Sequence, residues 1–391
     1  MSVNYMSFEQ SATFLAAIHS QVTGQTSIAP VDESGFISMA QATLRAGTDP
    51  ILSAISQMIG QTLVSVRAYT AKLAGLEKGS SEWGGIKRKI NFIETAPEDN
   101  EAYNLVDNQS VDPFTVKKPK TLETHYYGRD IYGDHMSLPD YQLAVAFSSS
   151  SELGAFVTGL MQHWSNQREQ WLEDMKRALL CNFIAAKYTA DGGTGDMVVH
   201  LLTEYNAATG GSYTATTIKD PANFAAFTRW AYARINTLAR MMSERSEKFQ
   251  LRVNNAPIMR HTPAVDLKCY LLAELKDQID AMALSVTYND NYLKLADNEG
   301  VSFWQSIEAP DQIQVTPAYV DADLAIAAAS PVTLTDVVGV LFDRDAVGYH
   351  IYREKMEAIR NPAADYVNQW YKLEVQLMND ITEKGVVLML D

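Results

Sequence analysis

Hydrophobic and polar positions repeat with the period of an α-helix between residues 149 and 188. Apolar residues recur there at spacings of three, four or seven, from Leu153 to Ile184. The opposite, polar face consists of Gln167, Arg168, Glu169, Glu173, Asp174, Lys176 and Arg177. Serines at 149–151 can cap this helix, and Glu152 in its first turn favours the helix dipole. At a rise of about 1.5 Å per residue such a helix spans roughly 50 Å. The pattern therefore predicts a long spine against which other elements pack.

Residues 79–148 alternate in the manner of β-strands, but polar side chains occupy both faces. The alternation is clearest over 86–95 and 114–132, with a polar tip at 96–112 between them. Two strands without a continuous apolar face cannot bury enough surface to be stable alone. The pattern predicts a β-ribbon that is supported from outside itself, as in a subunit that reaches onto its neighbours.

Charged residues are concentrated on this ribbon. The basic ones on its two arms are Lys87, Arg88, Lys89, Lys117, Lys118 and Lys120, and the acidic ones near its tip include Glu98, Asp99 and Glu101. One interpretation is an ordinary solvated face. The other is electrostatic registration between subunits, in which basic arms meet acidic patches of the next copy. Both remain open at this stage.

The remaining segments predict a mixture of helices and strands. A short amphipathic helix is expected at 8–22, and the small residues of 20–48 favour an extended or loosely ordered arm. Asp49 and Pro50 stand at good positions for starting a second helix. Residues 200–330 predict an α/β unit, in which a helix opens at Asp220-Pro221.

Near the C-terminus the pattern becomes that of strands. Residues 336–352 and 385–390 include continuous apolar runs, typical of strands that are buried on both faces. Between them, Asn361-Pro362 predicts a corner, because the residue before proline is disfavoured in helical conformation. Alternation from Val367 to Leu377 then places one face of a strand in the core. Arg360 is either a surface cation or a partner in an inter-subunit salt bridge.

Composition narrows the range of functions. With 391 residues, 47% of them hydrophobic, the chain can build a substantial core, and it has neither a signal peptide nor an apolar run long enough to span a membrane. Its 32 basic and 47 acidic residues give a net charge of −15. This charge disfavours a DNA-binding protein, but it does not exclude a container that encloses DNA. Cys181 and Cys269 stand in apolar contexts and predict buried free thiols.

Motifs of catalysis and of cofactor binding are absent from the sequence. The seven histidines are scattered, and no dinucleotide-binding, Walker or nucleophile-elbow motif is present. The pair Asp343 and Asp345 could hold a cation or form a turn, and the cluster Asp130, Asp134 and His135 is better explained by turn hydrogen bonds. We therefore expect no enzyme activity, no cofactor and no metal site.

The C-terminal segment, residues 339–388, resembles the closing segment of tailed-phage major capsid proteins with the HK97-like fold, in particular those of small podoviruses such as phi29. The resemblance rests on the corner KMEAIRNP at 355–362 and on the aromatic residues Tyr366, Trp370 and Tyr371 that follow it. Further matches, in the same order along the chain, lie at 49–66, 116–132 and 261–275.

The resemblance implies an α+β fold with a definite division of the chain. Its parts are an N-terminal arm with the first helix and strand (1–78), an extended β-hairpin loop (79–148), a peripheral domain with the spine helix (149–199 and 331–391) and an axial α/β domain (200–330). The hairpin would lie across an adjacent subunit. No Lys–Asn–Glu trio for the covalent crosslink known in this fold can be assigned, so we expect a non-covalent shell. The chain ends directly after its last strand, so we expect no added immunoglobulin-like domain.

The function implied is that of a major capsid protein. It would assemble into pentamers and hexamers of an icosahedral or prolate phage head that encloses double-stranded DNA without reading its sequence. Expected partners are a scaffolding protein during assembly and a portal protein at one vertex, with assembly in the host cytoplasm and no membrane. Two alternatives remain: the shell protein of an encapsulin-like cellular nanocompartment, and a cytosolic α/β enzyme.

Overall fold

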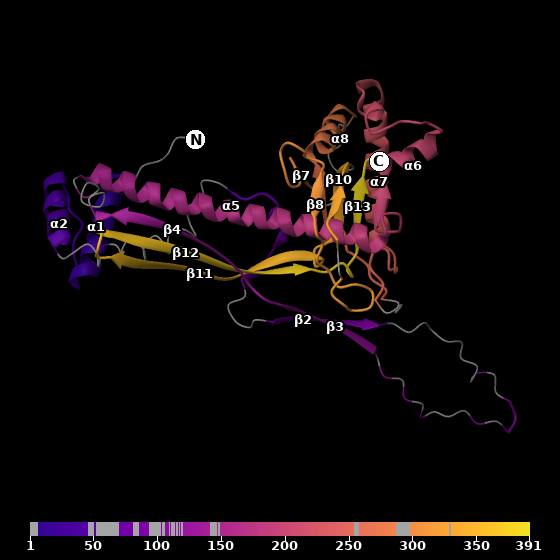
Figure 1. Cartoon of the computed structure of the whole chain (residues 1–391), viewed down its shortest axis with the longest axis horizontal. Coiled ribbons are helices and arrows are strands. Elements are labelled where there is room, and N and C mark those ends of the chain that lie inside the picture. The colour runs from indigo at the N-terminus through magenta and orange to yellow at the C-terminus, as the bar shows by residue number, and fades with distance from the viewer. Residues whose placement is uncertain are drawn as a thin grey trace.

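The structure of the chain is a computed structural model. It describes residues 7–45, 51, 70–80, 86–93, 103, 106–108, 110, 114, 116, 118, 120–140, 147, 149–253, 258–286, 298–327 and 330–391. Within these residues, two larger sheets and two groups of helices are arranged along one long helix, and a hairpin projects from one side (Figure 1).

The long helix is α5, Ser150–Asp191, and it runs through the length of the body (Figure 1). The Ser149 hydroxyl accepts a hydrogen bond from the Glu152 amide at 3.3 Å, which caps its first turn. Gly192, at φ 68°, ends it in the left-handed conformation. The spine predicted over 149–188 is therefore confirmed, and its 42 residues span about 60 Å.

A four-stranded sheet lies along the N-terminal part of α5 (Figure 1). Its order is β1–β11–β12–β4, with bounds Glu77–Ser80, Val347–Asn361, Tyr366–Asn379 and Asp130–Pro139. The predicted alternation in β12 is confirmed from Val367 to Leu373, where Val367, Tyr371 and Leu373 are buried and Trp370 is exposed. It is wrong beyond Leu373, because Glu374 and Gln376 are buried as well. Tyr371 packs against Trp164 and Trp171 of α5, with ring centroids 5.6 Å apart in both pairs.

The corner between β11 and β12 also forms where the sequence predicts it. The Asn361 side chain accepts a hydrogen bond from the Ala363 amide at 2.9 Å and donates one to the Tyr366 hydroxyl at 2.8 Å. These bonds close the turn that begins at Pro362, and Asp365 completes it at φ 49°.

A five-stranded sheet stands at the other end of α5 (Figure 1). Its order is β5–β13–β10–β6–β7, with bounds Val198–His200, Gly385–Met389, Val337–Asp343, Leu267–Leu272 and Asn298–Val301. β10 and β13 are buried almost throughout, as their continuous apolar runs predict.

Three helices accompany this sheet, and they are α6 Leu201–Thr209, α7 Pro221–Ser243 and α8 Ala273–Val286. Pro221 occupies the first turn of α7, after Asp220, as expected. The sheet takes strands from both sides of the expected boundary between residues 330 and 331. The division of the chain into domains stays a prediction. The short elements are η1 Ala74–Leu76, η3 Thr217–Lys219 and the strand pair β8 Ile313–Val315 and β9 Val332–Leu334.

Two helices near the N-terminus pack against the start of α5, and they are α1 Phe8–Thr23 and α2 Glu33–Arg45. The helix expected at 8–22 is confirmed. The extended arm expected over 20–48 is wrong for residues 33–45, because Phe36, Ala40 and Thr43 are buried at helical spacing. The helix expected to start at Asp49-Pro50 lies outside the described residues, apart from position 51.

The hairpin consists of β2 Ile86–Ile93 and β3 Lys120–Tyr127. The two strands pair antiparallel, from Ile86 opposite Tyr127 to Ile93 opposite Lys120, without a register shift. The strand expected over 114–132 is divided at Gly128, which adopts φ 95°. Beyond this glycine β4 leaves the hairpin and pairs with β12. The extended hairpin of the expected fold is therefore present, with a shorter second arm.

Candidate functional site

The hairpin strands lie beside the body of the molecule (Figure 1). This hairpin exposes large apolar side chains. Phe92 is 64% exposed, and Phe114 and Val116, in the segment before β3, are 83% and 79% exposed. Leu122 of β3, by contrast, is buried against Val253 and Ile258. The hairpin thus rests on its own chain at Leu122 and leaves Phe92, Phe114 and Val116 uncovered.

An ion-pair cluster fixes the base of the hairpin. The Lys89 ammonium lies 2.7 Å from Oδ2 of Asp380 and also pairs with Glu383, which in turn pairs with Arg260. Both Asp380 and Glu383 belong to the turn between β12 and β13. Burial alone would lower the pKa of Lys89, but the two carboxylates raise it. The cluster therefore ties β2 to the joint between the two sheets.

The neighbouring basic residues of β2 also have partners in the same chain. The Lys87 ammonium lies 2.7 Å from Nδ1 of His350, and burial lowers the pKa of Lys87. Arg88 forms an ion pair with Glu123 across the hairpin, with Nε and Oε1 3.1 Å apart. The structure thus gives the three adjacent cations different surroundings, and their role between subunits stays a prediction.

The other candidate residues are distributed over the chain. Lys118 is exposed just before β3, and Lys120 is exposed as the first residue of β3. Lys117, Glu98, Asp99 and Glu101 lie outside the described residues. Arg360 is at the far end of the β11–β12 pair from Asp380, where its guanidinium lies 2.9 Å from Asp140 and 3.4 Å from Asp365. The structure does not bring Arg360 together with the basic residues of the hairpin.

A buried cluster of four charged residues on α5, called the clasp below, was not predicted from the sequence. Glu169 and Glu173, expected on the polar face of the spine, are buried together with Lys176 and Arg177. Their carboxylates accept hydrogen bonds from the amides of residues 71 and 72, at 2.8 and 3.4 Å, and Glu299 accepts one from residue 73 at 2.7 Å. The clasp holds the segment that leads into β1 against the spine. The sequence did carry one indication of this cluster: residues 169, 173 and 177 stand four apart and therefore share one face of the helix.

The residues considered for catalysis have structural roles. Asp343 accepts hydrogen bonds from the Asp345 amide at 2.8 Å and from the Thr262 hydroxyl at 2.7 Å, so the Asp343–Asp345 pair forms a turn. His135 stacks on Trp370 with ring centroids 4.4 Å apart. No group of three or more His, Cys, Asp or Glu side chains in the described part of the chain is placed to hold a metal ion.

The two cysteines and the apolar helices agree with their sequence patterns. Cys181 and Cys269 are buried free thiols, as expected, and burial raises the pKa of each to about 12. Among the described helices, none combines the length and the hydrophobicity needed to cross a membrane.

Comparison with known proteins identifies the fold and the family. The family of Phi29-like phage major capsid proteins matches residues 15–388. A chain in the capsid structure of Staphylococcus phage Andhra is similar with a TM-score of 0.55 and 12% identity, over 84% of this chain and 86% of that one. A chain in the structure of head fiber and inner core protein gp22 of native bacteriophage P68 gives 0.53 and 11%, over the same shares. No curated protein sequence matches.

Both structural likenesses confirm the fold expected from the sequence. The family match covers nearly the whole chain, including the spine, both sheets and the hairpin strands. This protein belongs to the family of Phi29-like phage major capsid proteins.

Proposed function

We propose that copies of this capsid protein form pentamers and hexamers of an icosahedral or prolate head that encloses double-stranded DNA, and that each hairpin lies across an adjacent copy. The exposed apolar surface of the hairpin carries this proposal. Fully burying one side chain such as Phe114 stabilises by about 1.5–3 kcal/mol, and the contact is repeated around every ring. The hairpin thus gains from a neighbour the burial that its own chain does not supply.

The charged residues have a supporting role in this arrangement. Lys118 and Lys120 are exposed and can meet acidic groups of the next copy, together with Lys117. Lys87, Arg88, Lys89 and Arg360 already have partners in their own chain, so a contact between copies would extend those interactions. In the same scheme Glu98, Asp99 and Glu101 contribute acidic groups near the hairpin tip.

The domain roles follow from the same scheme. Residues 200–330, with α6, α7 and α8, would surround the five- and six-fold axes as the axial domain. The spine and residues 331–391 would form the peripheral domain, and residues 1–78 would pack along the shell. The family match over residues 15–388 favours a phage head over a cellular nanocompartment.

The remaining parts of the proposal concern partners. The net charge of −15 suits an inner wall over which packaged DNA can move without being gripped. A scaffolding protein would guide assembly in the host cytoplasm, and a portal protein would replace one pentamer. The chain would act as a structural component, without catalysis or cofactor, and the shell would be held together without covalent crosslinks.

Expression with and without the scaffolding protein of the same phage tests this proposal. Electron microscopy should show closed shells or hexamer sheets, and on a denaturing gel of these particles this chain should run only as a 43.4 kDa monomer. A soluble monomer under every assembly condition would overturn the proposed assembly. A ladder of covalent oligomers on the gel would overturn the non-covalent shell while leaving assembly intact.

A further inference from the structure

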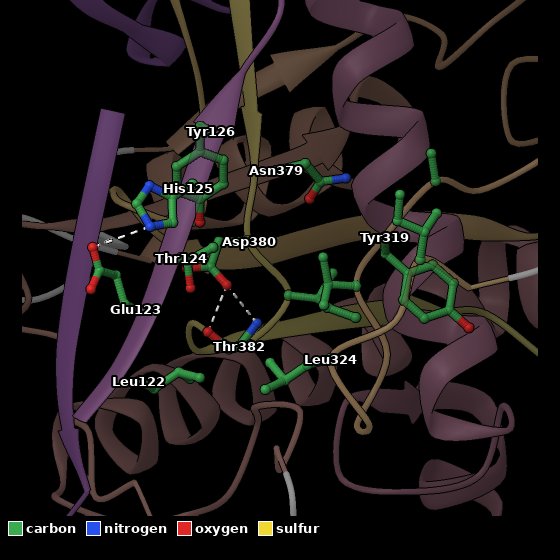
Figure 2. Close-up of a pocket in the computed structure, with 14 residues that line it drawn as sticks. Leu122, Glu123, Thr124, His125, Tyr126, Tyr319, Leu324, Asn379, Asp380 and Thr382 are labelled. Atoms are coloured by element: carbon green, nitrogen blue, oxygen red, sulfur yellow. Dashed lines mark hydrogen bonds and ion pairs between the residues drawn. The ribbon is translucent and has the colours of Figure 1, made fainter. Parts of the chain in front are cut away.

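A groove of about 450 Å³ lies between the hairpin and the body (Figure 2). Its walls are residues 122–126 of β3, residues 318–320, 324 and 326 of a loop, and residues 379–382 at the end of β12. In Figure 2 the Asn379 side chain lies between Tyr126 on the hairpin side and Tyr319 on the loop side. Of these lining residues, Leu122, Glu123 and Asp380 take part in the contacts described above.

The loop wall of the groove is apolar and preformed. Leu324 and Ile326 line it, and Ile326 is 79% exposed. The Asp321 carboxylate accepts hydrogen bonds from the amides of Asp323 at 3.0 Å and Ala325 at 2.9 Å, which fixes the loop. Because the loop is already ordered, covering its apolar side chains requires little further loss of conformational freedom.

The hairpin wall is the edge of a strand. Five consecutive residues of β3, 122–126, line the groove, whereas side chains on one face of a strand are every second residue. β2 occupies the other edge of β3, and among the described residues no further strand pairs with it. β12 reaches this edge of β3 through a side chain, because the Gln376 carboxamide donates a hydrogen bond to the Tyr126 carbonyl at 3.1 Å. An unpaired edge of this kind is a template for another strand.

Asn379 supplies an independent observation. Both polar atoms of its carboxamide are inaccessible to solvent, and neither has a hydrogen-bond partner in the described part of the chain. Buried polar atoms without partners are rare in native proteins. A carboxamide presents a donor and an acceptor side by side, which matches the C=O and N–H groups of a passing backbone.

The chain itself offers a suitable occupant. Phe114, Val116 and Lys118 are exposed and stand at every second position, so in an extended strand they share one face. Two apolar side chains followed by a cation complement a groove whose loop carries Leu324 and Ile326 beside the acidic residue Asp323.

We infer that the groove of one copy receives an extended segment of a second copy of this chain, which pairs with the open edge of β3, bonds to the Asn379 carboxamide and covers Ile326. This inference rests on the proposed assembly and specifies where copies meet. It uses the mode of recognition in which an added strand provides backbone hydrogen bonds and apolar pockets hold alternate side chains.

Photo-crosslinking tests the inference in assembled particles. With p-benzoylphenylalanine at position 326, irradiated shells should give a covalent dimer on a denaturing gel, and irradiated free subunits should give none. Amides of β3 should exchange more slowly with deuterium in shells than in free subunits. Shells that form but give no dimer, that crosslink position 326 to a different protein, or that leave β3 exchange unchanged would overturn the inference and leave the proposed assembly standing.

A substitution series at the same position gives a second test. Ile326→Asp places a charge in the contact and should raise the concentration needed for assembly by at least about tenfold, whereas Ile326→Val should leave it nearly unchanged. Equal assembly of both variants would contradict the inference. Failure of the unmodified chain to assemble at all would instead count against the proposed function.

Discussion

The tie between the hairpin and the body can be tested with Lys89→Ala. In the unmodified chain the Lys89 side chain is 22% exposed, and its ammonium lies 2.7 Å from Asp380, whose side chain is 3% exposed. Removing the ammonium leaves a buried carboxylate without its ion-pair partner. Thr382 still donates to Asp380 from its amide and its hydroxyl, at 2.9 and 2.6 Å, so the charge keeps part of its support.

The size of the effect follows from the surroundings of Asp380. Burial would raise the pKa of this carboxyl, but Lys89, together with Thr382 and Arg260, lowers it to about 2 from 3.8. A pKa unit corresponds to about 1.4 kcal/mol, so these interactions stabilise the folded state by about 2 kcal/mol at neutral pH. Breaking a buried ion pair typically costs about 3–5 kcal/mol. Since Lys89 is partly exposed and Thr382 remains, we expect a loss of about 2 kcal/mol.

Urea unfolding of free subunits, followed by tryptophan fluorescence, measures this loss. Lys118→Ala, an exposed lysine beside the same hairpin, is the control and should change stability by less than about 0.5 kcal/mol. Because the pKa of Asp380 is lowered by folding, its contribution is present above about pH 4 and disappears as the pH falls towards 2. The difference between Lys89→Ala and the unmodified chain should shrink over that interval. Equal unfolding midpoints at pH 7 would refute the reasoning.

Three further predictions concern other contacts. Glu33→Ala removes the carboxylate that accepts from the Ser150 amide at 2.9 Å and hydroxyl at 2.7 Å, and urea unfolding should show a loss of about 2 kcal/mol that an exposed Glu9→Ala control lacks. Burial lowers the pKa of Lys187 to about 7, so stability should rise with pH from 7 to 10 in the unmodified chain and rise less in Lys187→Met; equal slopes would contradict this. Pro362→Gly should reduce the yield of particles more than the yield of soluble subunits, and intact particles at normal yield would argue against the importance of this corner.

Local patterns were enough to predict the elements with strong periodicity. The spine, the alternation in β12 and the buried strand β10 depend on burial of one face or of both, and that burial is visible as a spacing of apolar residues. The Asn361-Pro362 corner was predictable because proline restricts the residue before it. The helix at residues 33–45 was missed because its buried face consists largely of small residues such as Ala40 and Thr43.

The long-range electrostatic contacts could not be predicted from the sequence. Lys89 meets Asp380 across 291 positions, and Glu299 meets the Leu73 amide across 226, so neither pair produces a local signal. The sequence identified Lys87, Arg88 and Lys89 as a charged group but could not separate their individual partners. Burial of Glu169 and Glu173 likewise depends on a segment about a hundred positions earlier in the chain.

The most direct test of the account is a cryo-electron microscopy map of assembled shells in which the chain can be traced through each hairpin. The account predicts that Phe114 and Val116 of every copy are buried against an adjacent copy, while Lys89 stays paired with Asp380 of its own chain. Shells in which these apolar side chains remain in solvent, or in which each hairpin contacts its own chain alone, would contradict it.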